Sequence, residues 1–374
     1  MNICIITAFD TNEQRADMLK RVFLEAGHSV IVLASDWKHL EKVKRVEAKE
    51  GYRLFHAKPY YKNLSIDRII SHVRLSRKIF NYVDKHHNEI DVLWVIFPPN
   101  SFVKDAAKIK EKYPQIKLVL DANDFWPETL PAEKARNLWP MAYWRDLRNN
   151  HINAADQVVT ECQLFEDNLK PVIKDTPSKT IYLARDIQKP QLPAALPEDR
   201  IYLCWLGAIN NIIDIPKIQE VIENISRYKP VTLHIIGSGE NLDLLVESAQ
   251  SSGAAVLYHG IVYDQVEKKQ IMDQCHYGLN IMKDTVVVGL TMKSLDYFAS
   301  GLPILNTIKA DTWAFTEKEK IGFNVQPSLD YEQVVNYDIS MRQHTADFYM
   351  NTFTYPVFKE NVLSLPVFEN LSEK

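Results

Sequence analysis

The chain has 374 residues, of which 46% are hydrophobic and 25% are charged. These proportions are typical of a globular protein and exclude a disordered, collagen-like or membrane-spanning chain. At roughly 150 residues per domain, the length predicts two domains. The 44 Lys and Arg against 48 Asp and Glu give a net charge of −4, so we expect no nucleic-acid partner.

The cysteines and the N-terminus point to a cytoplasmic protein. The four cysteines are far apart in the sequence and match no zinc or disulfide pattern, and free thiols suit a reducing compartment. The first residues, MNICIITAFD, place no basic stretch ahead of the apolar run. This order argues against a signal peptide.

The first half of the chain predicts a parallel sheet. Residues 3–7 and 30–34 read as buried strands, and residues 15–26 between them read as a helix that stops at Gly27. A strand, a helix and a strand in this order form a βαβ unit, which implies parallel strands. Further strands are expected at 92–97, 118–120 and 157–160.

A basic stretch occupies residues 53–87, where eight Lys and Arg face only two Asp, an excess of six positive charges. Apolar residues from Ile66 to Val83 recur with helical spacing and give this stretch an apolar side. Such a helix can lie on an anionic membrane surface, which predicts a peripheral membrane contact. It can equally pack on the sheet and expose its basic side to water, and both alternatives stay open.

The pattern restarts after a proline-rich segment, residues 186–200, which reads as a linker. Strands are expected at 201–206, 231–236, 255–258, 277–281 and 304–306, and helices at 216–227 and 292–299. The sequence therefore predicts an α/β protein with two Rossmann-like, doubly wound domains, residues 1–185 and 201–328. Residues 329–374 are expected to be a helical C-terminal segment.

Glycine is scarce and unevenly placed. Only 11 glycines occur, about 3% against an average near 7%, and nine of them follow residue 200. Glycine permits tight turns and a close approach of backbone to a ligand. The second half could therefore hold a phosphate-type site, or the loops could simply differ between the halves.

The common cofactor motifs are absent. The segment Gly237-Ser238-Gly239 follows a predicted strand but lacks the third glycine of a dinucleotide fingerprint. There is no P-loop, no nucleophile elbow and no Asp-x-Asp triplet that would hold Mg²⁺. We therefore expect neither a cofactor nor a metal.

The segment from Gly289 to Gly301 is the richest in candidate site residues. Gly289, Leu290 and Thr291 form a loop that opens a helix, where free N–H groups and the helix dipole favour a diphosphate. Lys293 would add a positive charge in the first turn, and Asp296 could accept hydrogen bonds from the two hydroxyls of a ribose. The alternative is a capped helix with ordinary surface charges.

This segment, with Tyr297-Phe298-Ala299-Ser300-Gly301-Leu302-Pro303-Ile304, resembles the donor site of family 4 glycosyltransferases of the GT-B fold. Asp296 matches the second acid of the family's Glu-x7-Glu motif, whereas Val288 stands at the first. The segments 121–128, 206–214, 235–239 and 259–262 also resemble this family, as does 60–72, which is similar to exopolysaccharide and capsule enzymes.

The resemblance implies a retaining glycosyltransferase that transfers a sugar from a UDP-sugar to a glycan or a polyprenyl-diphosphate-linked acceptor in bacterial surface polysaccharide synthesis. The donor would bind the second domain and the acceptor the first. The donor-site residues are Gly207, Asn210, Asn211, Gly237, Val262, Gly289, Leu290, Thr291, Lys293 and Asp296. The C-terminal segment would cross back to the first domain.

The catalytic candidates are Lys293, which would stabilise the leaving diphosphate, and Asp124, which would orient the acceptor or act as a base. Asp124 could instead cap a short helix. Two other functions stay open: a nucleotide-sugar 2-epimerase of the same fold, and a non-catalytic nucleotide-binding partner of another glycosyltransferase, which Val288 favours.

Overall fold

The computed structural model describes residues 1–62, 65–129, 138–186 and 189–369, which form two compact units. The first unit contains residues 1–183 together with the chain from 355 onward, and the second contains residues 184–354. Three predicted segments are described only in part. The basic stretch lacks residues 63–64, the linker lacks 187–188 and the C-terminal segment lacks 370–374, all of which lie outside the described residues.

The first unit is built on a seven-stranded parallel sheet in the order β5-β2-β1-β6-β7-β8-β9. Its strands are β1 (Asn2–Thr7), β2 (Ser29–Ser35), β5 (Tyr52–Phe55), β6 (Val92–Phe97), β7 (Lys117–Ala122), β8 (Gln157–Thr160) and β9 (Ser178–Thr180). A separate antiparallel pair consists of β3 (Trp37–Lys38) and β4 (Val43–Lys44). Every residue of β6 is buried, as expected for a parallel strand covered on both faces.

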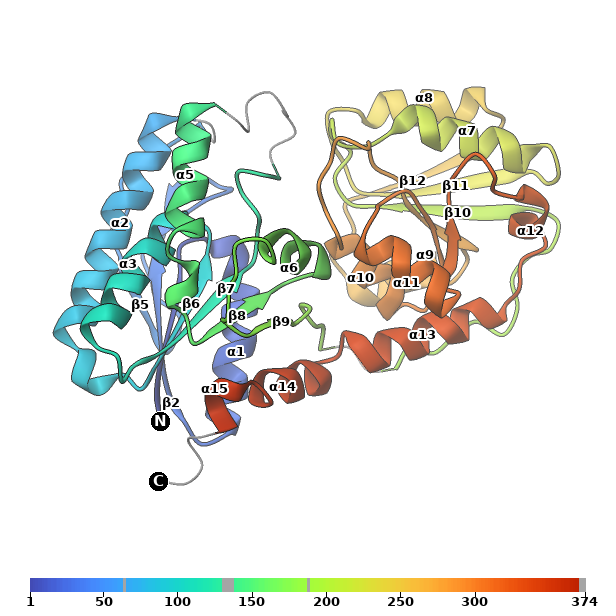
Figure 1. Cartoon of the computed structure of the whole chain (residues 1–374). Coiled ribbons are helices and arrows are strands. Elements are labelled where there is room, and N and C mark those ends of the chain that lie inside the picture. The colour runs from blue at the N-terminus through green and yellow to red at the C-terminus, as the bar shows by residue number, and fades with distance from the viewer. Residues whose placement is uncertain (63–64, 130–137, 187–188, 370–374) are drawn as a thin grey trace. The chain divides into compact units, whose positions relative to one another are not determined.

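Helices cover both faces of this sheet. The α-helices are α1 (Glu13–Glu25), α2 (Ile66–Lys85), α3 (Asn100–Lys112), α5 (Trp139–Asn149), α6 (Gln163–Leu169), α14 (Tyr355–Leu363) and α15 (Pro366–Glu369). Short 3-10 turns occur at η1 (Asp10–Asn12), η2 (His87–Glu89) and η3 (Ile152–Ala154). Helices α2, α3 and α5 lie side by side on one face, and α1 lies on the other with α14 and α15 (Figure 1).

The basic stretch is not one helix, since it begins with strand β5 and continues as helix α2. Ser65 caps α2 by accepting a hydrogen bond from the Arg68 N–H. The apolar side of α2, including Ile79, Phe80 and Val83, is buried in the core of the first unit. This packing on the sheet leaves the basic side of the helix available for any contact with an anionic surface.

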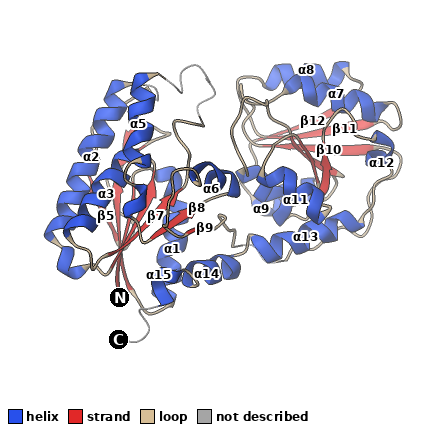
Figure 2. Cartoon of the chain, viewed as in Figure 1, coloured by secondary structure: helices blue, strands red, loops and turns tan. Residues whose placement is uncertain are grey.

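The second unit contains a six-stranded parallel sheet in the order β12-β11-β10-β13-β14-β15. Its strands are β10 (Ile201–Leu206), β11 (Val231–Ile236), β12 (Ala255–Gly260), β13 (Tyr277–Asn280), β14 (Ile304–Asn306) and β15 (Gly322–Asn324). Its helices are α7 (Ile215–Ser226), α8 (Leu242–Ser251), α9 (Gln265–Met272), α10 (Met292–Ala299), α11 (Asp311–Glu319), α12 (Tyr331–Val335) and α13 (Ser340–Thr352). Helices α7, α8 and α12 cover one face, and α9, α10, α11 and α13 the other (Figures 1 and 2).

Both units therefore have the α/β doubly wound architecture that the sequence predicts, and the fold class is confirmed. The described part of the predicted linker, residue 186 and residues 189–200, contains neither helix nor strand. Within the described chain, no helix is both long and apolar enough to cross a lipid bilayer.

The C-terminal segment contains several helices, of which α12 and α13 belong to the second unit and α14 and α15 to the first. Helix α14 packs on α1, where the Arg21 guanidinium lies 3.7 Å from the centroid of the Tyr355 ring and Lys359 pairs with Glu25 at 2.7 Å. Phe368 of α15 lies beside Phe23 of α1, with ring centroids 5.4 Å apart. These contacts make the last helices part of the core of the first unit.

Candidate functional site

Two glycine loops touch at the carboxyl edge of the second sheet. The Gly207 N–H donates to the Ile236 carbonyl at 2.8 Å, and the Gly237 N–H donates to the Gly260 carbonyl at 2.7 Å. A Cβ atom on Gly237 would lie 2.1 Å from the Gly207 oxygen, and Gly237 also has a φ of 142°. The loops after β10 and β11 therefore lie so close together that only glycine fits at position 237.

Three further donor-site candidates lie on the same edge of the sheet. The Asn210 carboxamide oxygen accepts a hydrogen bond from the Ile212 N–H at 3.2 Å, and the Asn211 oxygen accepts one from Asn241 at 3.3 Å. Val262 is buried in the loop that follows β12. The two asparagines thus shape the loops that carry them.

Helix α10 begins at a tightly anchored loop. Thr291 is its N-cap, and the Thr291 Oγ1 accepts a hydrogen bond from the Ser294 N–H at 3.2 Å. The Gly289 carbonyl oxygen accepts hydrogen bonds from the Thr312 N–H at 3.0 Å and from the Thr312 hydroxyl at 2.6 Å. Leu290, between them, is half-buried. The cap satisfies the Ser294 N–H, and the N–H groups of Met292 and Lys293 before it have no acceptor within the helix, so they can bind an anion.

Lys293 reaches from the first turn of α10 to the end of β10. The Lys293 ammonium nitrogen lies 3.8 Å from the centroid of the Trp205 ring, within cation–π distance. Burial lowers the pKa of Lys293 to about 7, because the charged form loses water. A bound anion would favour the charged form again, so a diphosphate beside Lys293 would raise its pKa.

Asp296, one turn further along α10, has an ion-pair partner that the sequence did not reveal. The Asp296 Oδ1 accepts hydrogen bonds from the Nε and Nη2 of Arg185 at 3.3 and 3.2 Å. The two residues are 111 positions apart, and Arg185 belongs to no motif, so no local pattern predicts the pair. The arginine holds the carboxylate in one orientation.

A row of three buried asparagines lies behind this helix, and the sequence analysis also missed it. Asn280, Asn306 and Asn324 end the adjacent strands β13, β14 and β15 in register. Asn280 donates to Asn306, and Asn306 donates to Asn324, each at 2.8 Å. The Thr291 hydroxyl donates to the Asn280 oxygen at 3.4 Å. This asparagine ladder connects three strand ends to the N-cap of α10.

Asp124 belongs to the first unit and follows β7. The Asp124 Oδ1 accepts hydrogen bonds from the Phe125 N–H at 2.6 Å and from the Thr129 hydroxyl at 2.9 Å. Burial raises the pKa of the Asp124 carboxyl, while these two hydrogen bonds act in the opposite direction. Residues 126–129 form turns, so no helix is capped there. A carboxylate with a raised pKa is a stronger base.

The structure thus brings Gly207 and Gly237 together in one pair of loops, and Gly289, Thr291, Lys293 and Asp296 together around α10. Lys293 and Trp205 connect the helix with β10. Within the described residues, no three His, Cys, Asp or Glu side chains gather in a way that could hold a metal ion.

No protein-family model and no curated protein matches the sequence. Solved structures do match over nearly the full length. HepE from Anabaena in complex with UDP has a TM-score of 0.67 at 13% identity, covering 100% of both chains. The lipopolysaccharide outer core galactosyltransferase WaaB has a TM-score of 0.68 at 12% identity, covering 97% of this chain and 98% of WaaB.

Sucrose-phosphate synthase from Thermosynechococcus elongatus has a TM-score of 0.65 at 11% identity, covering 97% of both chains. These structures share two parallel α/β sheets in separate domains with the present chain, as the sequence resemblance led us to expect. The chain therefore has the GT-B fold.

Proposed function

We propose that this protein is a retaining glycosyltransferase that transfers a sugar from a UDP-sugar to a glycan or a lipid-linked acceptor in bacterial surface polysaccharide synthesis. The proposal rests on the start of α10, where first-turn N–H groups and Lys293, whose ammonium lies over the Trp205 ring, would bind a diphosphate. Similar folds include HepE with bound UDP and the galactosyltransferase WaaB.

In this proposal the second unit binds the donor and the first unit the acceptor. The bond between the sugar C1 and the diphosphate oxygen breaks, and C1 forms a bond with the acceptor oxygen. The acceptor proton passes either to the departing diphosphate, with Asp124 orienting the hydroxyl, or to the Asp124 carboxylate. Lys293 and the first turn of α10 stabilise the negative charge that develops on the diphosphate.

Isothermal titration calorimetry with UDP and UDP-glucose tests the donor site. Lys293→Gln removes one charged contact to the diphosphate, so we expect UDP affinity to fall about tenfold or more. Lys217→Gln is the matched control, because Lys217 lies in the first turn of α7 but pairs with Glu220. Unchanged UDP affinity in Lys293→Gln would contradict the proposed role of Lys293.

A panel of radiolabelled UDP-, GDP- and TDP-sugars tests the reaction itself. Transfer to an acceptor, or slow hydrolysis of one donor, supports the glycosyltransferase. A donor altered at C2 of its sugar would show the 2-epimerase instead. If none of the nucleotide sugars binds, the proposal fails.

A non-catalytic nucleotide-binding partner is the second candidate, because Val288 stands where the resembling family has its first acidic residue. Binding of a UDP-sugar without transfer or hydrolysis would favour this candidate.

A further inference from the structure

One edge of the sheet in the second unit is open to another strand. β12 is the outermost strand of this sheet on the side of β11, and among the described residues no strand pairs with its outer side. Alternate residues of an edge strand point their backbone N–H and C=O groups away from the sheet. Because β12 has six residues, its outer side offers a row of such groups to a partner strand.

The side chains of β12 are open to water on both faces of the sheet. Leu257 is 47% exposed, and Tyr258, which points to the opposite face, is 50% exposed. Ala255 and His259 are exposed as well, and Val256 is half-buried. In the neighbouring strand β11, by contrast, every residue is buried. The helices of the second unit therefore leave β12 uncovered.

The exposed apolar surface continues beside the strand. Leu244 of α8, a helix that packs on β12, is 52% exposed, and Ile261, which directly follows the strand, is 54% exposed. With Leu257 and Tyr258, four large apolar side chains are thus exposed at or beside this edge. Apolar side chains that gather on a surface in this way mark a site of interaction.

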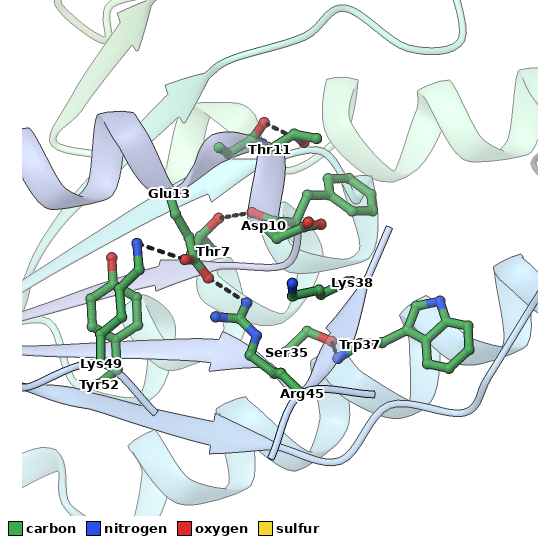
Figure 3. Close-up of polar contacts among 12 residues, drawn as sticks. Thr7, Asp10, Thr11, Glu13, Ser35, Trp37, Lys38, Arg45, Lys49 and Tyr52 are labelled. Carbon is green, nitrogen blue, oxygen red and sulfur yellow. Dashed lines mark hydrogen bonds and ion pairs between the residues drawn. The ribbon is translucent and has the colours of Figure 1, made fainter. Parts of the chain in front are cut away.

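The other edge strands are protected by charge or by their shortness. β5 contains the exposed Arg53, and Lys49, just before it, pairs with Glu13 at 3.0 Å (Figure 3). β9 and β15 have three residues each, and the middle residue of β9 is Lys179. Short strands and charged side chains prevent edge-to-edge pairing. β12 has neither protection, since it is longer and contains no Lys, Arg, Asp, Glu or Pro.

The sequence of β12 fits a second copy of itself. A two-fold axis pairs a strand with its own copy in antiparallel orientation, so the residues of the strand meet one another. Residues 255–258 are Ala, Val, Leu and Tyr. Wherever these residues of the two copies overlap, aliphatic or aromatic side chains lie opposite each other, and such pairs stabilise a sheet. A charged peptide would find no opposite charge along this strand.

His259 is the side chain of β12 that can become positively charged. Its Nε2 lies 3.1 Å from the Nδ1 of His234, and the two rings stack with centroids 5.2 Å apart. Burial lowers the pKa of His259, although Glu267 acts in the opposite direction. The ring is therefore neutral at pH 7, and two copies of the strand bring no like charges together.

We propose that β12 pairs with β12 of a second copy of this chain, antiparallel and across a two-fold axis, and so joins the two six-stranded sheets into one. This inference does not depend on the proposed glycosyltransferase function. Four half-exposed large side chains and the strand edge amount to roughly 500 Å² per copy, against about 800 Å² in a standard interface. The dimer is therefore reversible, with a dissociation constant in the micromolar range.

Sedimentation equilibrium of the full-length chain, from about 1 to 100 µM, measures the association. We expect a monomer and a dimer in exchange. Leu257→Lys should weaken the dimer tenfold or more, because it replaces an apolar contact with a charge at the shared edge. Leu40→Lys, at a leucine of the first unit that is 69% exposed, is the matched control and should leave the dissociation constant within twofold. Circular dichroism shows that both variants are folded.

Hydrogen exchange of the unmodified protein tests the strand pairing without any substitution. The outward-pointing amides of residues 255–260 should exchange more slowly at 100 µM than at 1 µM, because a partner strand accepts their hydrogen bonds. In Leu257→Lys this dependence on concentration should be lost.

A protein that stays monomeric at 100 µM would overturn the inference. So would a dimer that Leu257→Lys and Leu40→Lys weaken equally, or one whose concentration-dependent protection lies outside residues 255–260, because another surface would then form the contact. None of these measurements uses a nucleotide sugar, so their outcome and that of the donor-binding experiments are separate.

Discussion

Lys293 carries the charge on which the proposed donor site depends, and its environment makes that charge sensitive to pH. Its ammonium lies on the Trp205 ring, and burial lowers its pKa to about 7. A bound diphosphate favours the protonated form, so the pKa of Lys293 rises when UDP binds. On the proposed function, the free protein takes up protons when it binds UDP above pH 7.

We expect UDP affinity to decrease as the pH rises, by about tenfold between pH 7 and pH 8.5, because the free protein must then protonate Lys293. Calorimetry in two buffers of different ionisation enthalpy measures both the affinity and the proton uptake. The Lys293→Gln protein should show neither effect. Equal pH dependence in the two proteins would assign the titration to another group.

Asp296 is proposed to bind the ribose hydroxyls, and its ion pair with Arg185 complicates a simple substitution. We therefore compare UDP with its 2′,3′-dideoxy analogue. In the unmodified protein the analogue should bind about tenfold more weakly, because two hydrogen bonds to the carboxylate are lost. In Asp296→Ala the two ligands should bind nearly equally.

Arg185→Gln is the control for the Asp296 experiment, because it removes the ion pair and keeps the carboxylate. It should retain a preference for UDP over the analogue. A preference that survives unchanged in Asp296→Ala would show that the ribose is bound elsewhere.

At the residue scale, the sequence predicted contacts between residues close in the chain and missed contacts between distant residues. Thr291 was predicted to lie at the start of a helix, and its hydroxyl accepts a hydrogen bond from Ser294, three positions further on. The Arg185 pair with Asp296 and the ladder through Asn306 join distant parts of the chain. Only the packing of the strands brings these side chains together, so no motif reveals them.

At the scale of elements, fully apolar strands were predicted well and short polar ones were missed. The predicted strands 92–97, 201–206 and 231–236 agree with β6, β10 and β11, because an apolar run with polar ends has clear limits. Strands β9 and β15 have three residues each. They lie at sheet edges, and pairing with a neighbour, not composition, makes them strands.

The asparagine ladder should stabilise the second unit. Asn306→Leu removes the hydrogen bonds of Asn306 to Asn280, Asn324 and the Ile308 backbone, and it leaves buried polar groups unsatisfied. We expect the free energy of unfolding to fall by roughly 2–4 kcal/mol. Urea denaturation measures the change, and Asn336→Leu, at an exposed asparagine, should have little effect. An equal loss in both variants would contradict a special role for the ladder.

Across the whole molecule, the uneven distribution of glycine follows from close packing in the second unit. A Cβ on Gly278 would lie 2.8 Å from the Tyr297 ring, and one on Gly322 would lie 1.9 Å from the Ile304 oxygen. With Gly237, these positions show that neighbouring backbone or a neighbouring ring lies too close for a side chain. Only some of the glycines in the second half of the chain therefore concern the proposed donor site.

The second unit is continuous in sequence, and its two ends are neighbours. The Arg185 N–H donates to the Phe353 carbonyl at 2.7 Å, and Arg185 pairs with Thr354 as a parallel bridge. We expect residues 184–354, expressed alone, to unfold cooperatively and to bind UDP within about tenfold of the full chain. Calorimetry with UDP measures this.

A fragment ending at residue 339 lacks α13, whose buried Arg342 donates to the Met272 and Cys275 carbonyls. It should fail to fold. If the two fragments behave alike, α13 is not part of the independent unit.

The packing of α14 and α15 on α1 has a consequence for synthesis on the ribosome. Residues 184–354 are all available once residue 354 has emerged, whereas the first unit still lacks the helices that cover α1. Until then, the side chains that Tyr355, Phe358 and Phe368 bury remain open to water. The part of the protein made first is thus the last to be completed, and its exposed α1 surface is where a nascent chain would need protection from aggregation.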